Sequence, residues 1–281
     1  MLNARLKAFY LCNSFLLVSM PFVADHKSAK ANPSSLETSL ISNAGKHLEP
    51  AIKLNKKEAV FVRKYIKNRG DCLVNVKKRS VIPFDIIDSV FRIYKIPVEL
   101  KYLAVIESEL KPNALSHVGA SGPWQLMPGT AKCLGLRVDR HIDQRTDFTL
   151  STRAAARYLK DLYAQFDDWL LVIAAYNGGP KPVHRAIRES GSRNFWVIQK
   201  HLPAESREHV KKFIATHYYF EGHGSETTLT RSEYMEYIKQ VNAFDSRQKT
   251  SLAVPVETSE QKFKRVMHES EESLKKSGKL I

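Results

Sequence analysis

Cysteine is scarce in this sequence, and its spacing excludes the common cysteine-based metal sites. Cys12, Cys72 and Cys133 form no C-x-x-C pair, and no closely spaced Cys/His pair occurs. This spacing argues against a metal site, and we also expect no organic cofactor. Cys12 lies inside an apolar stretch without small residues before it, which argues against a lipid-attachment cysteine. Cys72 and Cys133 could form one disulfide, and the alternative is that both are free thiols.

Acidic residues are also in deficit. The chain of 281 residues has 44 Lys+Arg against 29 Asp+Glu, a formal charge of +15. Such a charge favours polyanions, whether nucleic acid, anionic lipid or a cell-wall polymer. No Lys/Arg block with interleaved aromatic residues is present, so we expect no nucleic-acid partner. The other interpretation is a generally basic surface.

The amino terminus has the features of an export signal. Arg5 and Lys7 precede an apolar stretch, and Ala29-Lys30-Ala31 then offers a small-x-small cleavage pattern. We predict a signal peptide over residues 1–31 and a location in the periplasm or cell envelope. The alternative is an uncleaved anchor of about 17 residues, at the short edge of membrane-spanning length.

Strand patterns are missing as well. No alternation of apolar and polar residues extends beyond a few positions, and no internal repeat is found, so the chain is predicted to be mainly α. Gly70-Asp71 and Ile82-Pro83 are expected to separate helices. The expected helices are 56–68, 83–96, a helix beginning at Pro97, 149–166, 168–177 and 206–220. The expected domains are a signal peptide (1–31), a linker with a helical extension (32–95), a catalytic domain (96–225) and a polar C-terminal helix or tail (226–281).

Glu107 stands where an apolar residue is expected. In the run YLAVIESELKP (102–112), Leu103, Ala104, Ile106 and Leu110 share one helical stripe, and Glu107 lies near its middle. Burial among apolar side chains raises the pKa of a carboxyl group, and such an acid can protonate a glycosidic oxygen at neutral pH. The structural alternative is a buried glutamate paired with an arginine. Glu109 also lies near apolar residues, and periodicity does not separate the two.

Two further segments fit carbohydrate chemistry. The loop GASGPWQLMP (119–128) presents Trp124, Gln125 and Met127, whose flat apolar faces and amide suit a sugar. The run AAYNGGP (174–180) places Tyr176 and Asn177 at the end of a buried helix, where the Tyr176 hydroxyl would hold the acid. Taken singly, these residues are core side chains and a helix C-cap. Their joint occurrence favours a site that cleaves sugar polymers.

These motifs together resemble a known family. These segments are similar to the lytic transglycosylases with a soluble-type catalytic domain, above all to the membrane-bound lytic murein transglycosylase D type. The matching residues are Glu107-Ser108 with Ser116, then Gly119-Ala120, Gly122, Trp124-Gln125 and Met127–Ala131, and AAYNGGP (174–180). The resemblance runs from about Ile96 to Ala215. It implies a goose-lysozyme-like helical fold and cleavage of the β-1,4 bond between N-acetylmuramic acid and N-acetylglucosamine, with closure of a 1,6-anhydro sugar.

The resemblance also implies roles for individual residues. Glu107 would be the single catalytic acid and base; Tyr176 would hydrogen-bond it; Ser116, Gln125, Met127 and Asn177 would bind glycan. Asp139, Asp143 and Asp147 stay open as second acids. Pro123 replaces the usual leucine, and His209 and Lys211 stand where tyrosine and proline are common.

The expected partner is the peptidoglycan glycan strand. A monomer is expected, with room for a transient association with the membrane or an envelope machine. The alternatives are a goose-type lysozyme, which uses water as acceptor, and a non-catalytic peptidoglycan-binding protein.

Overall fold

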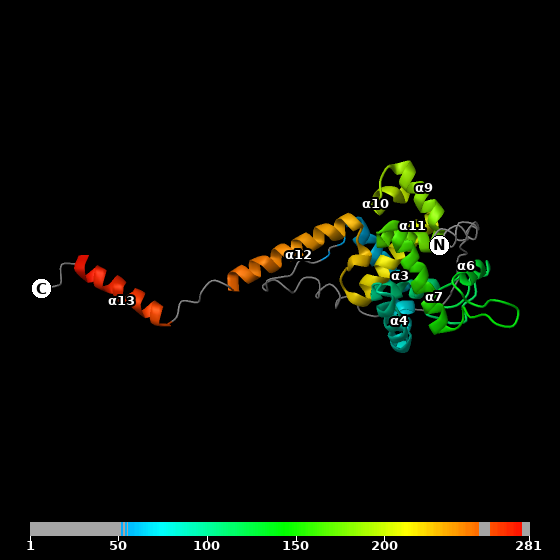
Figure 1. The fold of residues 1–281 in the computed structure, drawn as a ribbon, viewed down its shortest axis with the longest axis horizontal. Coiled ribbons are helices and arrows are strands. Elements are labelled where there is room, and N and C mark those ends of the chain that lie inside the picture. Colours follow the sequence, from blue (N-terminus) through cyan, green and yellow to red (C-terminus); the bar gives the residue numbers. More distant parts are fainter. Residues whose placement is uncertain (1–51, 53, 55, 253–258, 277–281) are drawn as a thin grey trace, which may run out of the picture. The chain divides into compact units, whose positions relative to one another are not determined.

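The computed structural model of the protein describes residues 52, 54, 56–252 and 259–276 (Figure 1). The predicted signal peptide over residues 1–31 lies outside the described residues, as does Cys12. The chain forms two compact units, Met1–Tyr237 and Ile238–Ile281, each of which is considered by itself. The domain boundaries expected from the sequence remain a prediction.

The first unit is built from helices. Among the described residues there is no strand, only isolated β-bridges near residues 115–126 and 138–143, so the mainly α prediction is confirmed. The elements up to the end of the first unit are α3 (Lys56–Arg79), α4 (Val81–Tyr94), η1 (Val98–Lys101), α5 (Tyr102–Ser108), α6 (Pro128–Cys133), α7 (Phe148–Phe166), α8 (Trp169–Gly178), α9 (Pro180–Ser190), α10 (Phe195–Ile198), η2 (Gln199–His201), α11 (Ala204–Glu221) and η3 (Glu226–Thr228), followed by the start of α12 (Arg231–Leu252).

The predicted break at Gly70-Asp71 is wrong, because α3 continues through both residues. A single glycine destabilises a helix by only about 1 kcal/mol. Leu73 and Val76 lie beyond this glycine and are 2% and 0% exposed, so the burial of that last part of α3 outweighs the glycine. The predicted boundary near Pro83 is confirmed within three residues, since α4 begins at Val81 and holds Pro83 in its first turn.

Helix α11 lies in the middle of the first unit. It packs against α3, α5 and α8 (Figure 1). Phe213 of α11 is fully buried, and α8 is buried along nearly its whole length, which explains why the sequence of α8 is apolar all round. Asp168 caps α8 by accepting bonds from the backbone of Leu170 and Leu171, and it also accepts one from Arg231 N at 2.7 Å.

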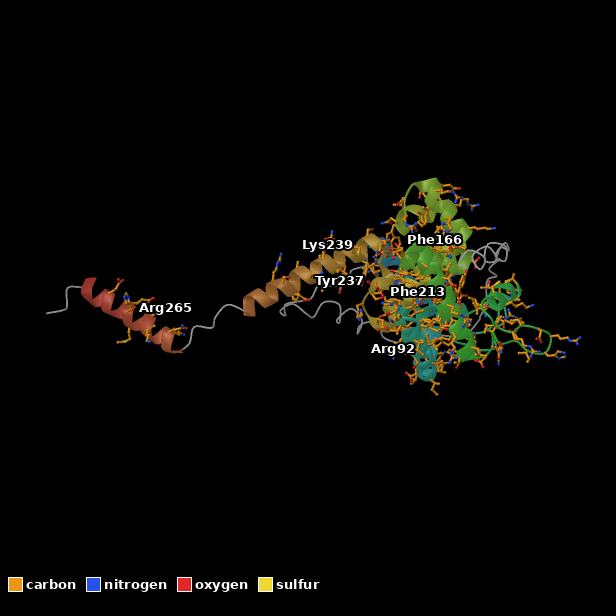
Figure 2. All side chains as sticks on the ribbon, viewed as in Figure 1. Arg92, Phe166, Phe213, Tyr237, Lys239 and Arg265 are labelled. Carbon is orange, nitrogen blue, oxygen red and sulfur yellow. The ribbon has the colours of Figure 1, made fainter. Side chains whose placement is uncertain are left out.

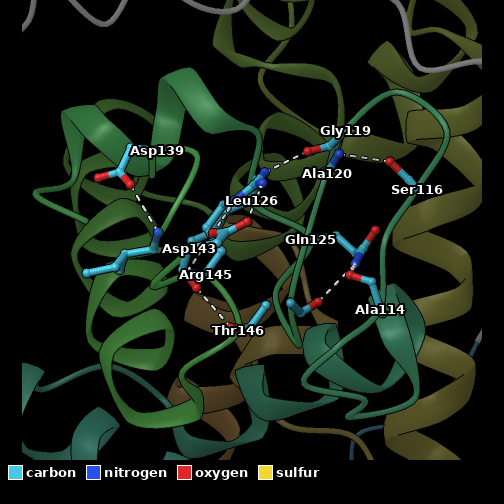
Figure 3. Close-up of polar contacts among 12 residues, drawn as sticks. Ala114, Ser116, Gly119, Ala120, Gln125, Leu126, Asp139, Asp143, Arg145 and Thr146 are labelled. Atoms are coloured by element: carbon cyan, nitrogen blue, oxygen red, sulfur yellow. Dashed lines mark hydrogen bonds and ion pairs between the residues drawn. The ribbon is translucent and has the colours of Figure 1, made fainter. Parts of the chain in front are cut away.

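The loop between α5 and α6 is organised around a buried arginine. The Arg145 guanidinium donates to the carbonyls of Gly119 and Leu126 at 2.6 and 2.8 Å and forms an ion pair with Asp143 at 2.7 Å (Figure 3). Leu126 also pairs with Ser121 through two backbone hydrogen bonds. Buried carbonyls need donors, and Arg145 supplies them where no regular sheet does.

The polar C-terminal stretch is helical where the structure describes it. The boundary between the two units falls within α12, and α13 (Ser259–Lys276) belongs to the second unit. Arg265 projects from α13, where the described side chains are exposed (Figure 2). Across the ranges that the structure describes, no helix has the length and apolarity needed to cross a membrane.

Neither cysteine of the described part forms a disulfide. Cys72 is half-buried and Cys133 is exposed. Of the two alternatives left by the sequence, the structure shows two separate thiols.

Two glycines of the loop give a matched stability test. Gly119 and Gly122 both have left-handed φ values, +86° and +82°, but a Cβ at Gly122 would lie 1.9 Å from the Arg145 carbonyl oxygen, whereas one at Gly119 meets nothing within 4 Å. Gly119→Ala should lower the free energy of unfolding by about 1–2 kcal/mol through backbone strain alone. Gly122→Ala should lower it by ~1–3 kcal/mol more. Urea unfolding measures both; equal losses would contradict this role of Gly122.

Candidate active site

Glu107 lies in the last turn of α5, and its side chain is only 17% exposed. Burial, and then the negative charge of Glu205, raise the pKa of its carboxyl group from 4.5 to about 8, although Lys212 acts in the opposite direction. The group is therefore a protonated carboxylic acid at neutral pH. The alternative of a buried glutamate paired with an arginine is wrong, because the basic side chain within 4 Å of its carboxyl group is His209.

Glu109, two residues further on, has the opposite environment. It is the C-cap residue of α5 and has a left-handed φ of 56°. Its carboxylate pairs with Lys111 at 2.9 Å and with Arg69 and Arg79, and it accepts a hydrogen bond from the Cys72 thiol at 3.0 Å. Burial alone would raise its pKa, but the Lys111 and Cys72 bonds outweigh burial and lower it. Glu109 is thus a structural carboxylate.

Tyr176 lies close to Glu107, although not with the expected hydrogen bond. Its hydroxyl donates to the carbonyl of Trp124 at 2.7 Å. The sequence predicted a hydrogen bond between Tyr176 and Glu107; a hydroxyl has one proton, and in this structure Tyr176 donates it to Trp124. The two groups are nevertheless close enough for the charge of Glu107, after burial, to raise the pKa of Tyr176. Tyr176 joins α8 to the loop beside the acid.

Two of the loop residues that are expected to bind glycan, Gln125 and Ser116, form hydrogen bonds with the backbone of the loop itself. Gln125 has a left-handed φ of 45°, and its amide nitrogen donates to the carbonyls of Gly122 and Ala114 at 2.9 and 3.2 Å (Figure 3). The amide oxygen is then the atom that can accept from a ligand. The hydroxyl of Ser116 accepts from Ala120 N at 2.9 Å. Met127, half-buried, precedes α6 as its N-cap.

Trp124 is a core residue rather than a sugar platform. Its side chain is fully buried, and its indole N–H donates to the Thr152 hydroxyl at 2.9 Å. The interpretation of Trp124 as an exposed flat face is therefore wrong. The ring packs against Phe91, and its backbone carbonyl holds Tyr176, so this residue fixes the loop that Gln125 belongs to.

Asn177 connects the end of α8 with the start of α11. Its Oδ1 accepts from the Ser206 hydroxyl at 3.0 Å, and its side chain also bonds to Glu205. Glu205 in turn acts electrostatically on Glu107, so Asn177 is linked to the acid through Glu205.

The three aspartates left open as second acids are engaged elsewhere. Asp139 pairs with Arg137, Asp143 pairs with Arg145, and Asp147 caps α7 through the backbone N–H of Leu150. Within the described ranges, no group of three or more His, Cys, Asp and Glu side chains is placed to hold a metal ion.

Sequence reasoning missed Glu205 and Lys212 as parts of the site. Both act on the pKa of Glu107 from α11, where they flank His209. The signal was available: positions 205, 209 and 212 follow the i, i+4, i+7 spacing of one helix face. Such a face becomes informative only once α5 is known to pack against α11.

With this geometry established, similarity to known proteins is informative. Residues 92–199 match the family described as the transglycosylase SLT domain. Membrane-bound lytic murein transglycosylase D of Escherichia coli (strain K12) is 34% identical over 176 residues, which cover 61% of this chain and 38% of that protein. Soluble lytic murein transglycosylase of the same strain is 32% identical over 121 residues, 41% of this chain and 19% of that protein.

A solved structure is also similar. The 70-kDa soluble lytic transglycosylase of Escherichia coli aligns with a TM-score of 0.47 and 26% identity over 64% of this chain and 33% of that chain.

The site and the sequence matches define a helical domain with a buried acid at the end of one helix and a glycine-rich loop beside it. Residues 92–199 match the transglycosylase SLT domain family, and the chain is similar in sequence to lytic murein transglycosylases. It spans 38% and 19% of the lengths of the two relatives named above.

The buried acid makes a prediction about stability. Below pH 4.5 Glu107 is protonated in the folded and unfolded chains, whereas between pH 4.5 and about 8 only the unfolded chain releases the proton. Stability is therefore lost as the pH rises through this window. Glu107→Gln removes the loss and should be ~2–4 kcal/mol more stable than wild type near pH 8 but similar near pH 4. Urea unfolding at both pH values tests this, with exposed Glu208→Gln as the control. Parallel pH dependence of wild type and Glu107→Gln would contradict a raised pKa.

Proposed function

We propose that the protein is a peptidoglycan lytic transglycosylase that cleaves the β-1,4 bond between N-acetylmuramic acid and N-acetylglucosamine. The observation that carries this proposal is the carboxyl group of Glu107, which burial keeps protonated at neutral pH. The match of residues 92–199 to the SLT domain family supports it, because the named relatives are murein transglycosylases.

The chemistry requires one acid that acts twice. Protonated Glu107 donates its proton to the glycosidic oxygen, the bond to the muramyl C1 breaks, and its electron pair stays on the leaving oxygen. The resulting carboxylate then accepts the proton of the muramyl 6-hydroxyl while that oxygen bonds to C1. A 1,6-anhydro ring forms, Glu107 is protonated again, and no water is consumed. A glycosidase with two carboxylates would need a second acid in contact with the bond.

The glycan would be held by the loop and by the end of α8. Gln125 offers its amide oxygen because the amide nitrogen is already bonded to two carbonyls. Ser116, Met127 and Asn177 would line the same cleft. Tyr176 would act by fixing the loop next to the acid rather than by donating to Glu107.

The protein would work outside the cytoplasm, in the periplasm or cell envelope, where its substrate is. Residues 1–31 would direct export, and the net charge of +15 would favour contact with the acidic groups of the wall. We expect a monomer that acts on glycan strands without a cofactor, with any membrane or envelope-machine association transient. The catalytic domain would span 96–225, with the helical extension of 32–95 before it.

Product analysis tests the function and the acid together. Purified sacculi treated with wild-type protein should release anhydromuramyl fragments, identified by mass spectrometry. Glu107→Gln should reduce their release by about 100-fold or more, since the amide cannot donate a proton to the leaving oxygen. Glu109→Gln is the matched control, because that carboxylate is held by basic residues and should keep most of the activity.

Two results would overturn the proposal. Reducing-end fragments from wild type would assign the protein to the hydrolases of goose-lysozyme type. Intact sacculi with bound wild-type protein would assign it to the non-catalytic peptidoglycan-binding proteins.

A further inference from the structure

A buried histidine of α11, His209, lies next to the carboxyl group of Glu107. His209 projects from α11, and its Nε2 is 3.4 Å from Oε1 of Glu107. The two side chains are only 8% and 17% exposed. This contact is where α11 packs against α5, so both groups sit on rigid helices rather than on the loop.

The Nε2 atom of His209 is buried and has no hydrogen-bond partner by strict geometry within the described part of the chain. A buried polar atom without a partner is unfavourable, and native structures seldom tolerate one. The distance of 3.4 Å exceeds a normal N–H···O bond by only a few tenths of an ångström. Hydrogen bonds to catalytic groups are often long without substrate and shorten in the complex.

The imidazole of His209 is uncharged at neutral pH. Burial, and then the positive charge of Lys212, lowers the pKa of His209 to about 3. The charged groups that face the pair are Glu205 and Lys212 on α11, and the neutral hydroxyl of Tyr176 approaches from α8. A neutral imidazole has one N–H, which is available to one acceptor.

We propose that His209 is a positioning residue that donates its Nε2–H to Oε1 of Glu107 and so reserves Oε2 as the oxygen that exchanges protons with the glycan. This inference rests on the proposed role of Glu107 as the acid. The donor holds the carboxyl plane in one orientation. It also stabilises the carboxylate that exists between the two proton transfers.

The position of this donor is a departure within the resemblance noted above, since tyrosine is common where this chain has His209. An imidazole N–H can supply the same kind of bond as a phenol but at a different reach.

Two substitutions distinguish a hydrogen-bond donor at position 209 from a side chain that only fills the space there. His209→Phe fills the pocket without an N–H, whereas His209→Gln places an amide nitrogen at the same number of bonds from Cα. The measurement is the pH dependence of kcat/KM on soluble glycan strands. Loss of the donor should move the upper limb, set by Glu107, to higher pH by about one unit and lower kcat about tenfold, with KM little changed. His209→Gln should restore both.

Two further variants act as controls. His217→Phe replaces another buried histidine of α11, whose ring contacts Tyr102 instead of the acid, and should leave the pH profile unchanged. Glu205→Gln removes a negative charge near Glu107 and should move the same limb to lower pH, opposite to His209→Phe. An unmoved limb in His209→Phe, or an equal shift in His209→Gln, would overturn the inference.

A second readout does not depend on activity. Nitrogen-15 NMR of histidine distinguishes the two neutral tautomers, and His209, assigned through His209→Gln, should carry its proton on Nε2 between pH 5 and 7. A proton on Nδ1 would overturn the inference even in an active enzyme. If wild-type protein yields no anhydro product, the proposed function fails, and the tautomer alone then decides the role of His209.

Discussion

The removal of the Glu107 carboxyl group from water is the interaction on which the rest of the site depends. An acid exposed to solvent would be ionised at neutral pH and could not protonate a leaving oxygen. The last turn of α5, the face of α11 and the end of α8 enclose this group, and the neighbouring Glu205 adds a like charge. The same enclosure makes the folded chain less stable above the normal pKa of a glutamate, so the fold has to supply that stability elsewhere.

The rest of the domain holds this enclosure in place. Asp168 secures the start of α8, and Tyr176 at its other end holds the carbonyl of Trp124. Ser108, next to the acid, donates to the carbonyl of Pro123 at 2.9 Å, so α5 and the loop are joined directly. Arg145 then donates hydrogen bonds to the carbonyls of Gly119 and Leu126 in this loop. A loop without regular secondary structure can thereby present Gln125 in a fixed orientation.

Much of this arrangement could be predicted from the sequence. The apolar stripe around Glu107, the all-round apolar α8 and the periodicity of α7 follow from the spacing of residues along a helix, which is a local property. The mainly α fold and the position of Glu107 were accessible for that reason. Gly70 shows the limit of local rules, because the burial of Leu73 and Val76 overrides its low helix propensity.

Other features depend on contacts between distant segments. Glu107 and Glu109 have similar apolar neighbours in the sequence, and only the three-dimensional fold brings Arg69 and Arg79 to one of them and His209 to the other. The burial of Trp124 and the partner of Tyr176 likewise depend on where the loop meets α7 and α8. A single sequence shows which residues are present, but it does not show which of them come into contact.

The measurement that tests the central claim most directly is a titration of the Glu107 carboxyl carbon by carbon-13 NMR in the folded wild-type protein, with the signal assigned through Glu107→Gln. The structure predicts a midpoint at a pH of about 8. A midpoint near the ordinary value of 4.5 would contradict the claim that the fold keeps this group as a protonated acid at neutral pH.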